Sequence, residues 1–137
     1  MNTTPKEVVK NFYDTNFIEN DSLAEDFFHP DLLLTWNSAT GISEMDYSDM
    51  VDFFVEIKRA YSDIRVEISH LLAQDNYVTV RYKYYARTLE DPEEEFGIAH
   101  FMVIWEIKEG KLFRGYQISQ PVLAVDEVKE DYKPVML

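Results

Sequence analysis

Three histidines are the side chains of this sequence best suited to exchange a proton near neutral pH. His70 shares an expected strand face with apolar neighbours such as Ile68 and Leu72. It is either a core histidine with satisfied hydrogen bonds or a pocket base whose pKa is tuned by burial. His29 precedes a proline at an expected helix end and is interpreted as a local cap. His100 falls on the outward face of a later strand, at an interface or in solvent.

Metal and cofactor chemistry are not expected. The histidines fall on different expected elements with no paired carboxylates between them, so the pattern predicts no metal site. Cysteine is absent, which excludes disulfide scaffolds, thiol nucleophiles and cysteine-ligated zinc. We expect no cofactor.

The chain is strongly acidic, with 26 acidic and 13 basic residues and a formal charge of −13. Repulsion from phosphates argues against nucleic acid and anionic membranes as partners. Acidic residues gather around Pro92 and in the tail, residues 122–137, and both segments are interpreted as solvated. Because neither a signal-peptide pattern nor a membrane span is visible in the sequence, we expect a cytoplasmic protein.

The first half of the chain predicts helices. Thr4 and Glu7 form a capping-box pattern at the start of the first helix. Ser22 and Glu25 repeat the pattern for a short second helix through Phe28. These spacings place two helices before the first strand.

A strand and a third helix follow. Leu32–Trp36 predicts a short strand, and Asn37–Gly41 is interpreted as the loop that leaves it. Asp46 or Ser48 can cap the third helix, which is expected to run to about Tyr61.

The second half predicts four consecutive strands, because apolar and polar residues alternate from Asp63 onward. Helices followed by strands indicate an α+β domain with the helices covering one face of an antiparallel sheet. At 137 residues we expect one domain, with a core of about residues 6–121.

The turn Glu109-Gly110 fixes the expected register of the last hairpin. Counting outward without interruption pairs Trp105 with Arg114 and Val103 with Tyr116, all on the inner face, where Gln120 also falls. The opposite face is too apolar to suit water and suggests the interface of a homodimer. Its expected residues are His100, Met102, Ile104, Phe113 and Gln117.

The order of elements resembles the nuclear transport factor 2-like superfamily, and most closely its SnoaL-like branch, which includes polyketide cyclases and is related to ketosteroid isomerase. The most specific stretch is Trp105–Pro121, which has a short turn with Gly110-Lys111 and ends in Gln120-Pro121. Leu34–Asn37 followed by Gly41 adds to the likeness. The resemblance implies a cone-shaped roll, in which a strongly curved sheet wraps around three N-terminal helices. It also implies a pocket at the open end and dimerisation through the outer face of the sheet.

Few of the catalytic residues of these enzymes have a counterpart in this sequence. Tyr13 falls at the position of the isomerases' hydrogen-bond donor, but Asn37 stands at the position of the base and Val103 near that of the second donor. The acid of the cyclases falls in the region of Gln117 and Gln120, which do not titrate. We therefore expect no ketosteroid isomerase, and only Tyr13 and His70 are candidates for catalysis.

The expected pocket binds a flat or largely apolar small molecule between aromatic walls that carry a few polar groups. One alternative is an enzyme of the isomerase, cyclase or dehydratase kind with unfamiliar catalytic residues. Another is a dimeric interaction module with a vestigial pocket. The expected lining residues are Tyr13, Trp36, Asn37, His70, Tyr82, Tyr84, Tyr116 and Gln120.

Overall fold

Capping boxes begin the two longer helices of the computed structural model, which describes residues 3–123. In α1 (Pro5–Asp14), the Thr4 hydroxyl accepts from the amide of Glu7, and the Glu7 carboxylate accepts from the amide of Thr4. Of the two caps considered for α3 (Tyr47–Ala60), Asp46 is the one used. The box predicted for α2 (Leu23–Phe27) is wrong, since Ser22 makes no side-chain capping bond within the described residues.

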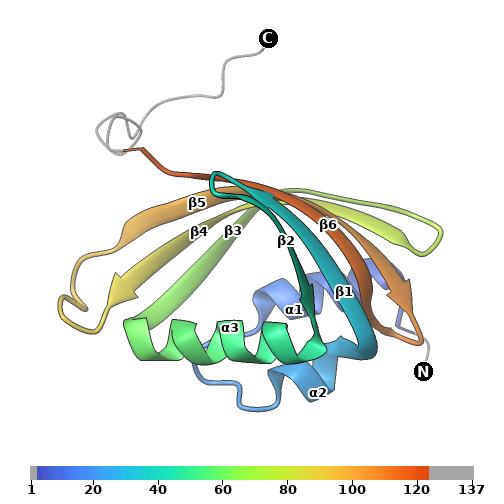
Figure 1. Ribbon diagram of the computed structural model, residues 1–137, viewed down its shortest axis with the longest axis horizontal. Helices are drawn as coiled ribbons and strands as arrows, with labels where there is room; N and C mark the ends of the chain where they lie inside the picture. Colours follow the sequence, from blue (N-terminus) through green and yellow to red (C-terminus); the bar gives the residue numbers. More distant parts are fainter. Residues whose placement is uncertain (1–2, 124–137) are drawn as a thin grey trace, which may run out of the picture.

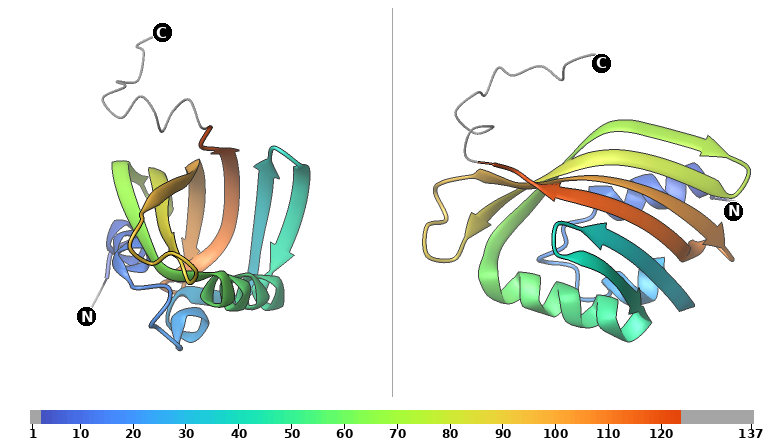
Figure 2. Two further views of the ribbon diagram at one scale, coloured as in Figure 1. Left: turned by 90° about the vertical axis from the view of Figure 1, so that its left-hand side faces the viewer. Right: turned by 45° about the horizontal axis from the view of Figure 1, so that its top comes forward.

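A curved six-stranded sheet covers the helices (Figures 1 and 2). Its strands run in the order β2-β1-β6-β5-β4-β3. The β1–β6 pair is parallel, and the other neighbouring pairs are antiparallel. The α+β class and the curved roll are therefore confirmed. The strands are β1 (Phe28–Ser38), β2 (Gly41–Asp46), β3 (Tyr61–Gln74), β4 (Tyr77–Thr88), β5 (Phe96–Lys108) and β6 (Lys111–Pro121).

The helices lie on the concave side of this sheet (Figure 2). Helix α1 packs mainly against β3 and β4, and α3 against β1 and β2. The inner sides of β4 and β5 bury Val80, Val103 and Trp105 almost completely, so the prediction that Val103 and Trp105 face inward is confirmed. The core thus occupies the hollow between the helices and the centre of the sheet.

The first strand is longer than predicted. It begins at Phe28 instead of Leu32, and the expected loop at Asn37 is the end of β1, from which a tight turn leads into β2. Strand β2 was missed because it lies at the sheet edge and most of its side chains are exposed, which leaves no inward and outward alternation to detect.

His29 lies within β1 and is buried, so its prediction as a helix cap is wrong. Its Nδ1 accepts from the amide of Asp31, and its Nε2 lies 2.9 Å from Oε1 of Glu109. The neutral ring therefore donates from Nε2 to the carboxylate. This contact ties β1 to the turn between β5 and β6.

A β-bulge at Phe113 exchanges the two faces of β6. Lys108 pairs with Lys111 and Ile107 with Leu112, as predicted, but Glu106 then pairs with Arg114. The extra residue shifts the alternation by one for the rest of the strand. The predicted pairing beyond the bulge is therefore wrong.

A second bulge, between Ile68 and His70, has the same effect in β3. His70 pairs with Arg81 and is exposed, and Leu72 is exposed on the same strand. Leu71 packs against the core instead. The prediction that His70 faces inward is wrong because it assumed an unbroken alternation.

Candidate ligand pocket

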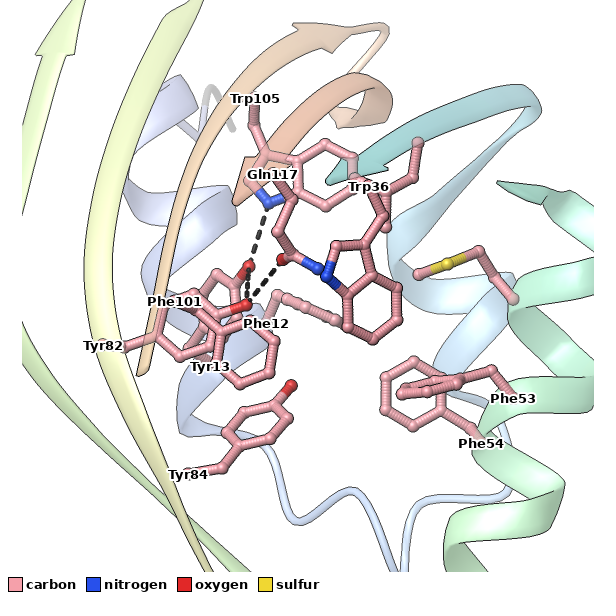
Figure 3. A pocket seen from close by; sticks show the side chains of 12 residues that line it. Phe12, Tyr13, Trp36, Phe53, Phe54, Tyr82, Tyr84, Phe101, Trp105 and Gln117 are labelled. Carbon is pink, nitrogen blue, oxygen red and sulfur yellow. Dashed lines mark hydrogen bonds between the residues drawn. The ribbon is translucent and has the colours of Figure 1, made fainter. Parts of the chain in front are cut away.

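The hollow of the sheet contains a cavity of about 20 Å³ between α1, α3 and the strands (Figure 3). A cavity of this size holds about one water molecule. Nine of the twelve side chains that line it are aromatic. The lining comprises Phe12, Tyr13, Leu34, Trp36, Met50, Phe53, Phe54, Tyr82, Tyr84, Phe101, Trp105 and Gln117.

A chain of hydrogen bonds crosses one wall of the cavity (Figure 3). The indole Nε1 of Trp105 donates to the hydroxyl of Tyr13 at 3.0 Å. That hydroxyl donates to the hydroxyl of Tyr82 at 3.4 Å, which in turn donates to Oε1 of Gln117 at 2.8 Å. The chain joins α1 to β4, β5 and β6, and all four side chains are buried.

Burial keeps the phenols of this wall protonated. It raises the pKa of Tyr13 to about 12, because desolvation of the phenolate outweighs the stabilisation by its hydrogen-bond partners Trp105 and Tyr82. Burial likewise raises the pKa values of Tyr82 and Tyr84 well above the usual value. Within the described residues, the lining contains no Asp, Glu, His, Lys or Arg. Its polar groups are therefore neutral at physiological pH.

Trp36 and Phe53 close the cavity from the side of β1 and α3 (Figure 3). Both are only partly buried, and their rings meet edge to face at 5.5 Å. The indole Nε1 of Trp36 donates to Oγ of Ser119 on β6 at 2.7 Å. One hydrogen bond therefore holds the larger of the two closing rings.

Four of the residues predicted to line the pocket do so: Tyr13, Trp36, Tyr82 and Tyr84. The other four do not, and they are all exposed. Asn37 follows Trp36 in the strand and takes the opposite face. Tyr116 and Gln120 are turned outward by the bulge in β6, and His70 by the bulge in β3.

The same bulge carries Gln117 inward, where the sequence analysis did not place it, and Ser119 with it. Gly115 is the sequence signal for this register. A Cβ added there would lie 2.6 Å from the ring of Trp105, so only glycine fits opposite the indole. A glycine inside a strand indicates such a close approach.

On the outer face, four apolar side chains are exposed at the centre of the sheet. Met102 pairs with Ile118, and Ile104 with Tyr116, across β5 and β6. Met102, Ile104 and the exposed His100 lie outside as predicted. Of the other two residues expected there, Gln117 is buried inside, and Phe113 lies at the hairpin end against the ring of His29.

No three acidic or histidine side chains within residues 3–123 are grouped closely enough to hold a metal ion. Among the described helices, none has the length and apolar character needed to cross a membrane.

Comparisons with solved structures show many similar folds. Wild-type IdmH of Streptomyces antibioticus, a candidate polyketide cyclase, has a TM-score of 0.68 at 12% identity, over 85% of this chain and 92% of that one. A protein of Catenulispora acidiphila with a ketosteroid isomerase-like fold, solved with trimethylamine, has a TM-score of 0.68 at 17% identity, over 96% and 100%. An LEH-like epoxide hydrolase of M. tuberculosis has a TM-score of 0.65 at 11% identity, over 84% and 81%.

At these identities the likeness shows the fold alone, because one fold hosts many activities. Curated proteins give no significant match to the sequence. The family model of the SnoaL-like domain matches residues 9–115, which is most of the chain. Because this match covers well over half of the sequence, the chain belongs to the SnoaL-like domain family.

Proposed function

We propose that this protein binds a small, flat and largely apolar molecule inside the cone, without using the cavity for acid-base catalysis. The observation that carries the proposal is the lining itself: aromatic walls with a few buried, hydrogen-bonded and neutral polar groups. Such a surface favours an apolar ligand held in one orientation. Among the described residues, this lining has no side chain that titrates near neutral pH, and this argues against proton transfer as its task.

Binding requires Trp36 and Phe53 to move, because the closed cavity holds no more than about one water molecule. Swinging these rings outward breaks one hydrogen bond and exposes roughly 100 Å² of apolar surface, which costs about 3 kcal/mol. The open form is then populated at about 0.6%, and ligand affinity falls by about 150-fold. This cost is compatible with micromolar binding if the ligand fills the opened cone.

The two tryptophans of the chain, Trp36 and Trp105, both line the cavity and report on its occupant. The test titrates the protein with indane, a flat hydrocarbon of two fused rings, and follows tryptophan fluorescence and the melting temperature. We expect a saturable fluorescence change. At ten times the dissociation constant, we expect a stabilisation of about 1.4 kcal/mol, or about 3–6 °C in melting temperature.

A Trp36→Phe variant should retain the response, since Trp105 still reports from the far side of the cavity. Absence of any response up to the solubility limit of indane would refute the proposal. It would favour the interaction module with a vestigial pocket, the reading that a nearly filled cone also fits.

A second proposal concerns the outer face of the sheet. We propose that two copies of the chain associate through an outer patch made of Met102, Ile104, Tyr116 and Ile118. The supporting observation is that these four exposed apolar side chains are direct cross-strand neighbours on the two central strands. A contiguous patch of this kind can bury itself against its own copy about a two-fold axis.

A further inference from the structure

The hydrogen-bond chain along the cavity wall has a direction, and its first member sets that direction. A tryptophan indole can donate but cannot accept, so the hydroxyl of Tyr13 must accept from Trp105. The proton of Tyr13 is then directed to Tyr82, and the proton of Tyr82 to Oε1 of Gln117. All three donors along the chain are used within the protein.

The reverse direction is disfavoured. If the amide of Gln117 were turned so that Nε2 donated to Tyr82, the proton of Tyr82 would point to Tyr13. The proton of Tyr13 would then face the N–H of Trp105, and a buried donor would lack an acceptor. A loss of this kind disfavours the arrangement by about 5- to 150-fold.

The direction of the chain leaves the amide N–H groups of Gln117 on the side away from Tyr82, toward Trp36 and the cavity (Figure 3). We infer that Gln117 is the residue that selects the ligand, and that the ligand presents a neutral hydrogen-bond acceptor, such as the carbonyl oxygen of a flat ketone. The inference rests on the proposed binding function. It assigns the ligand-facing donor to Gln117 instead of Tyr13, whose proton is already used.

The charge of the lining restricts the acceptor further. A carboxylate or phosphate would have to leave water without a cation beside it, since none of the described lining residues is Lys, Arg or His. The hydroxyl of Tyr84 also points into the cavity (Figure 3), but a hydroxyl can both donate and accept, so it does not distinguish a carbonyl from an N–H. The amide N–H groups of Gln117 are therefore the groups that favour a neutral carbonyl.

The test compares three probes of similar shape by isothermal titration calorimetry. Indane has no polar atom, 1-indanone adds an acceptor, and indole adds a donor. For the unaltered protein we expect 1-indanone to bind about 2- to 12-fold more tightly than indane, the range expected of one hydrogen bond. Indole should gain less than 1-indanone, because it can donate to the hydroxyl of Tyr84 but cannot accept from the amide of Gln117.

Two variants distinguish an effect of the direction of the hydrogen-bond chain from an effect of side-chain packing. Gln117→Met keeps the length of the side chain without its amide, and should bind 1-indanone no better than indole while still binding indane. Tyr82→Phe removes the hydroxyl that fixes the orientation of the Gln117 amide, so the amide can turn either its N–H groups or its oxygen to the ligand. The ratio of the affinities for 1-indanone and indole should then approach one. A merely structural role for Tyr82 would weaken all three probes by the same factor.

The outcomes are distinguishable. If indane binds but 1-indanone binds no more tightly, the inference is overturned and the binding function stands. If indole is the tightest probe, the direction of the chain is wrong. If none of the probes binds, the proposed function fails and the inference fails with it. Should Gln117→Met not fold, the ratio of 1-indanone to indole in Tyr82→Phe decides alone.

Discussion

At the scale of single residues, the buried phenols make the stability of the protein depend on pH at the alkaline end. Tyr13, Tyr82 and Tyr84 all have raised pKa values in the folded state because burial penalises the phenolate. The folded protein therefore binds more protons than the unfolded chain above pH 10. This contribution to stability is fully present below the pKa of tyrosine in the unfolded chain. It is lost as the pH rises through the pKa of the buried tyrosines in the folded protein.

We expect the free energy of unfolding in urea to fall between about pH 10 and pH 12, by about 3 kcal/mol for Tyr13 alone at full titration. In the Tyr13→Phe variant, the free energy of unfolding should fall less steeply with pH. The slopes are compared instead of the absolute stabilities, because the substitution also removes the acceptor of the Trp105 indole and lowers stability at every pH. Absorbance at 295 nm follows the ionisation. A folded protein in which all nine tyrosines ionise near pH 10 would contradict the expectation.

The contact between Trp36 and Ser119 should limit the speed of ligand entry. Removing it with Ser119→Ala weakens the closed form by one hydrogen bond, so we expect indane to associate about 2- to 12-fold faster. Stopped-flow tryptophan fluorescence measures this rate. Ser69→Ala removes a hydroxyl that is hydrogen-bonded to the carbonyl of Arg81, on the edge strand β3, and is the matched control. Equal rates in the two variants would show that Trp36 is not the gate.

At the scale of elements, the bulge in β6 decides what the pocket contains. It brings Gln117 and Ser119 to the inner face and sends Tyr116 and Ile118 outward. Gly115 is the residue that permits this register, because it leaves room for the ring of Trp105. The polar end of the cavity thus depends on one extra residue in one strand.

Gly115→Ala should be strongly destabilising. Its Cβ would meet the indole of Trp105 at 2.6 Å and the side chain of Leu34 at 2.7 Å, and overpacking of this kind costs about 1–3 kcal/mol. Urea unfolding measures the loss. The matched substitution Ser43→Ala, at an exposed position of β2, should change stability by no more than about 0.5 kcal/mol. An effect of Gly115→Ala as small as that of Ser43→Ala would refute the close packing.

At the scale of the whole molecule, the sheet separates two surfaces for which we propose different tasks. The helices lie on its concave side (Figure 2) and line the cavity together with the strands, and the outer patch lies on the opposite face. Because β5 and β6 contribute to both, alternate residues of the same strands serve the cavity and the proposed dimer.

The outer patch should control oligomeric state. We expect a homodimer at tens of micromolar by light scattering, and a monomer after Ile104→Glu, because a buried carboxylate at the centre of the interface is costly to desolvate. Val55→Glu, an equally exposed apolar position on α3, should leave the dimer intact. A monomeric unaltered protein would end the proposal, and so would a dimer indifferent to Ile104→Glu.

The sequence by itself determined the fold class, the family likeness and the inward position of residues where alternation is unbroken. Tyr82, Tyr84, Val103 and Trp105 were placed correctly, because they lie on β4 and β5, where inward and outward positions alternate without a break, and the extra residues of the two bulges lie on the partner strands β3 and β6. The acidic residues of the expected tail lie outside the described residues.

Only the tertiary structure decided which polar residues reach the cavity. A bulge is set by how neighbouring strands pair and bend, and a single extra residue reverses every position beyond it. For this reason His70, Tyr116 and Gln120 lie on the outer face instead of the inner face that was predicted. Gln117 lies inside, where it ends the hydrogen-bond chain that begins at Trp105. Alternation along one strand does not predict how the strands pair, because the pairing is fixed by contacts between residues far apart in the sequence.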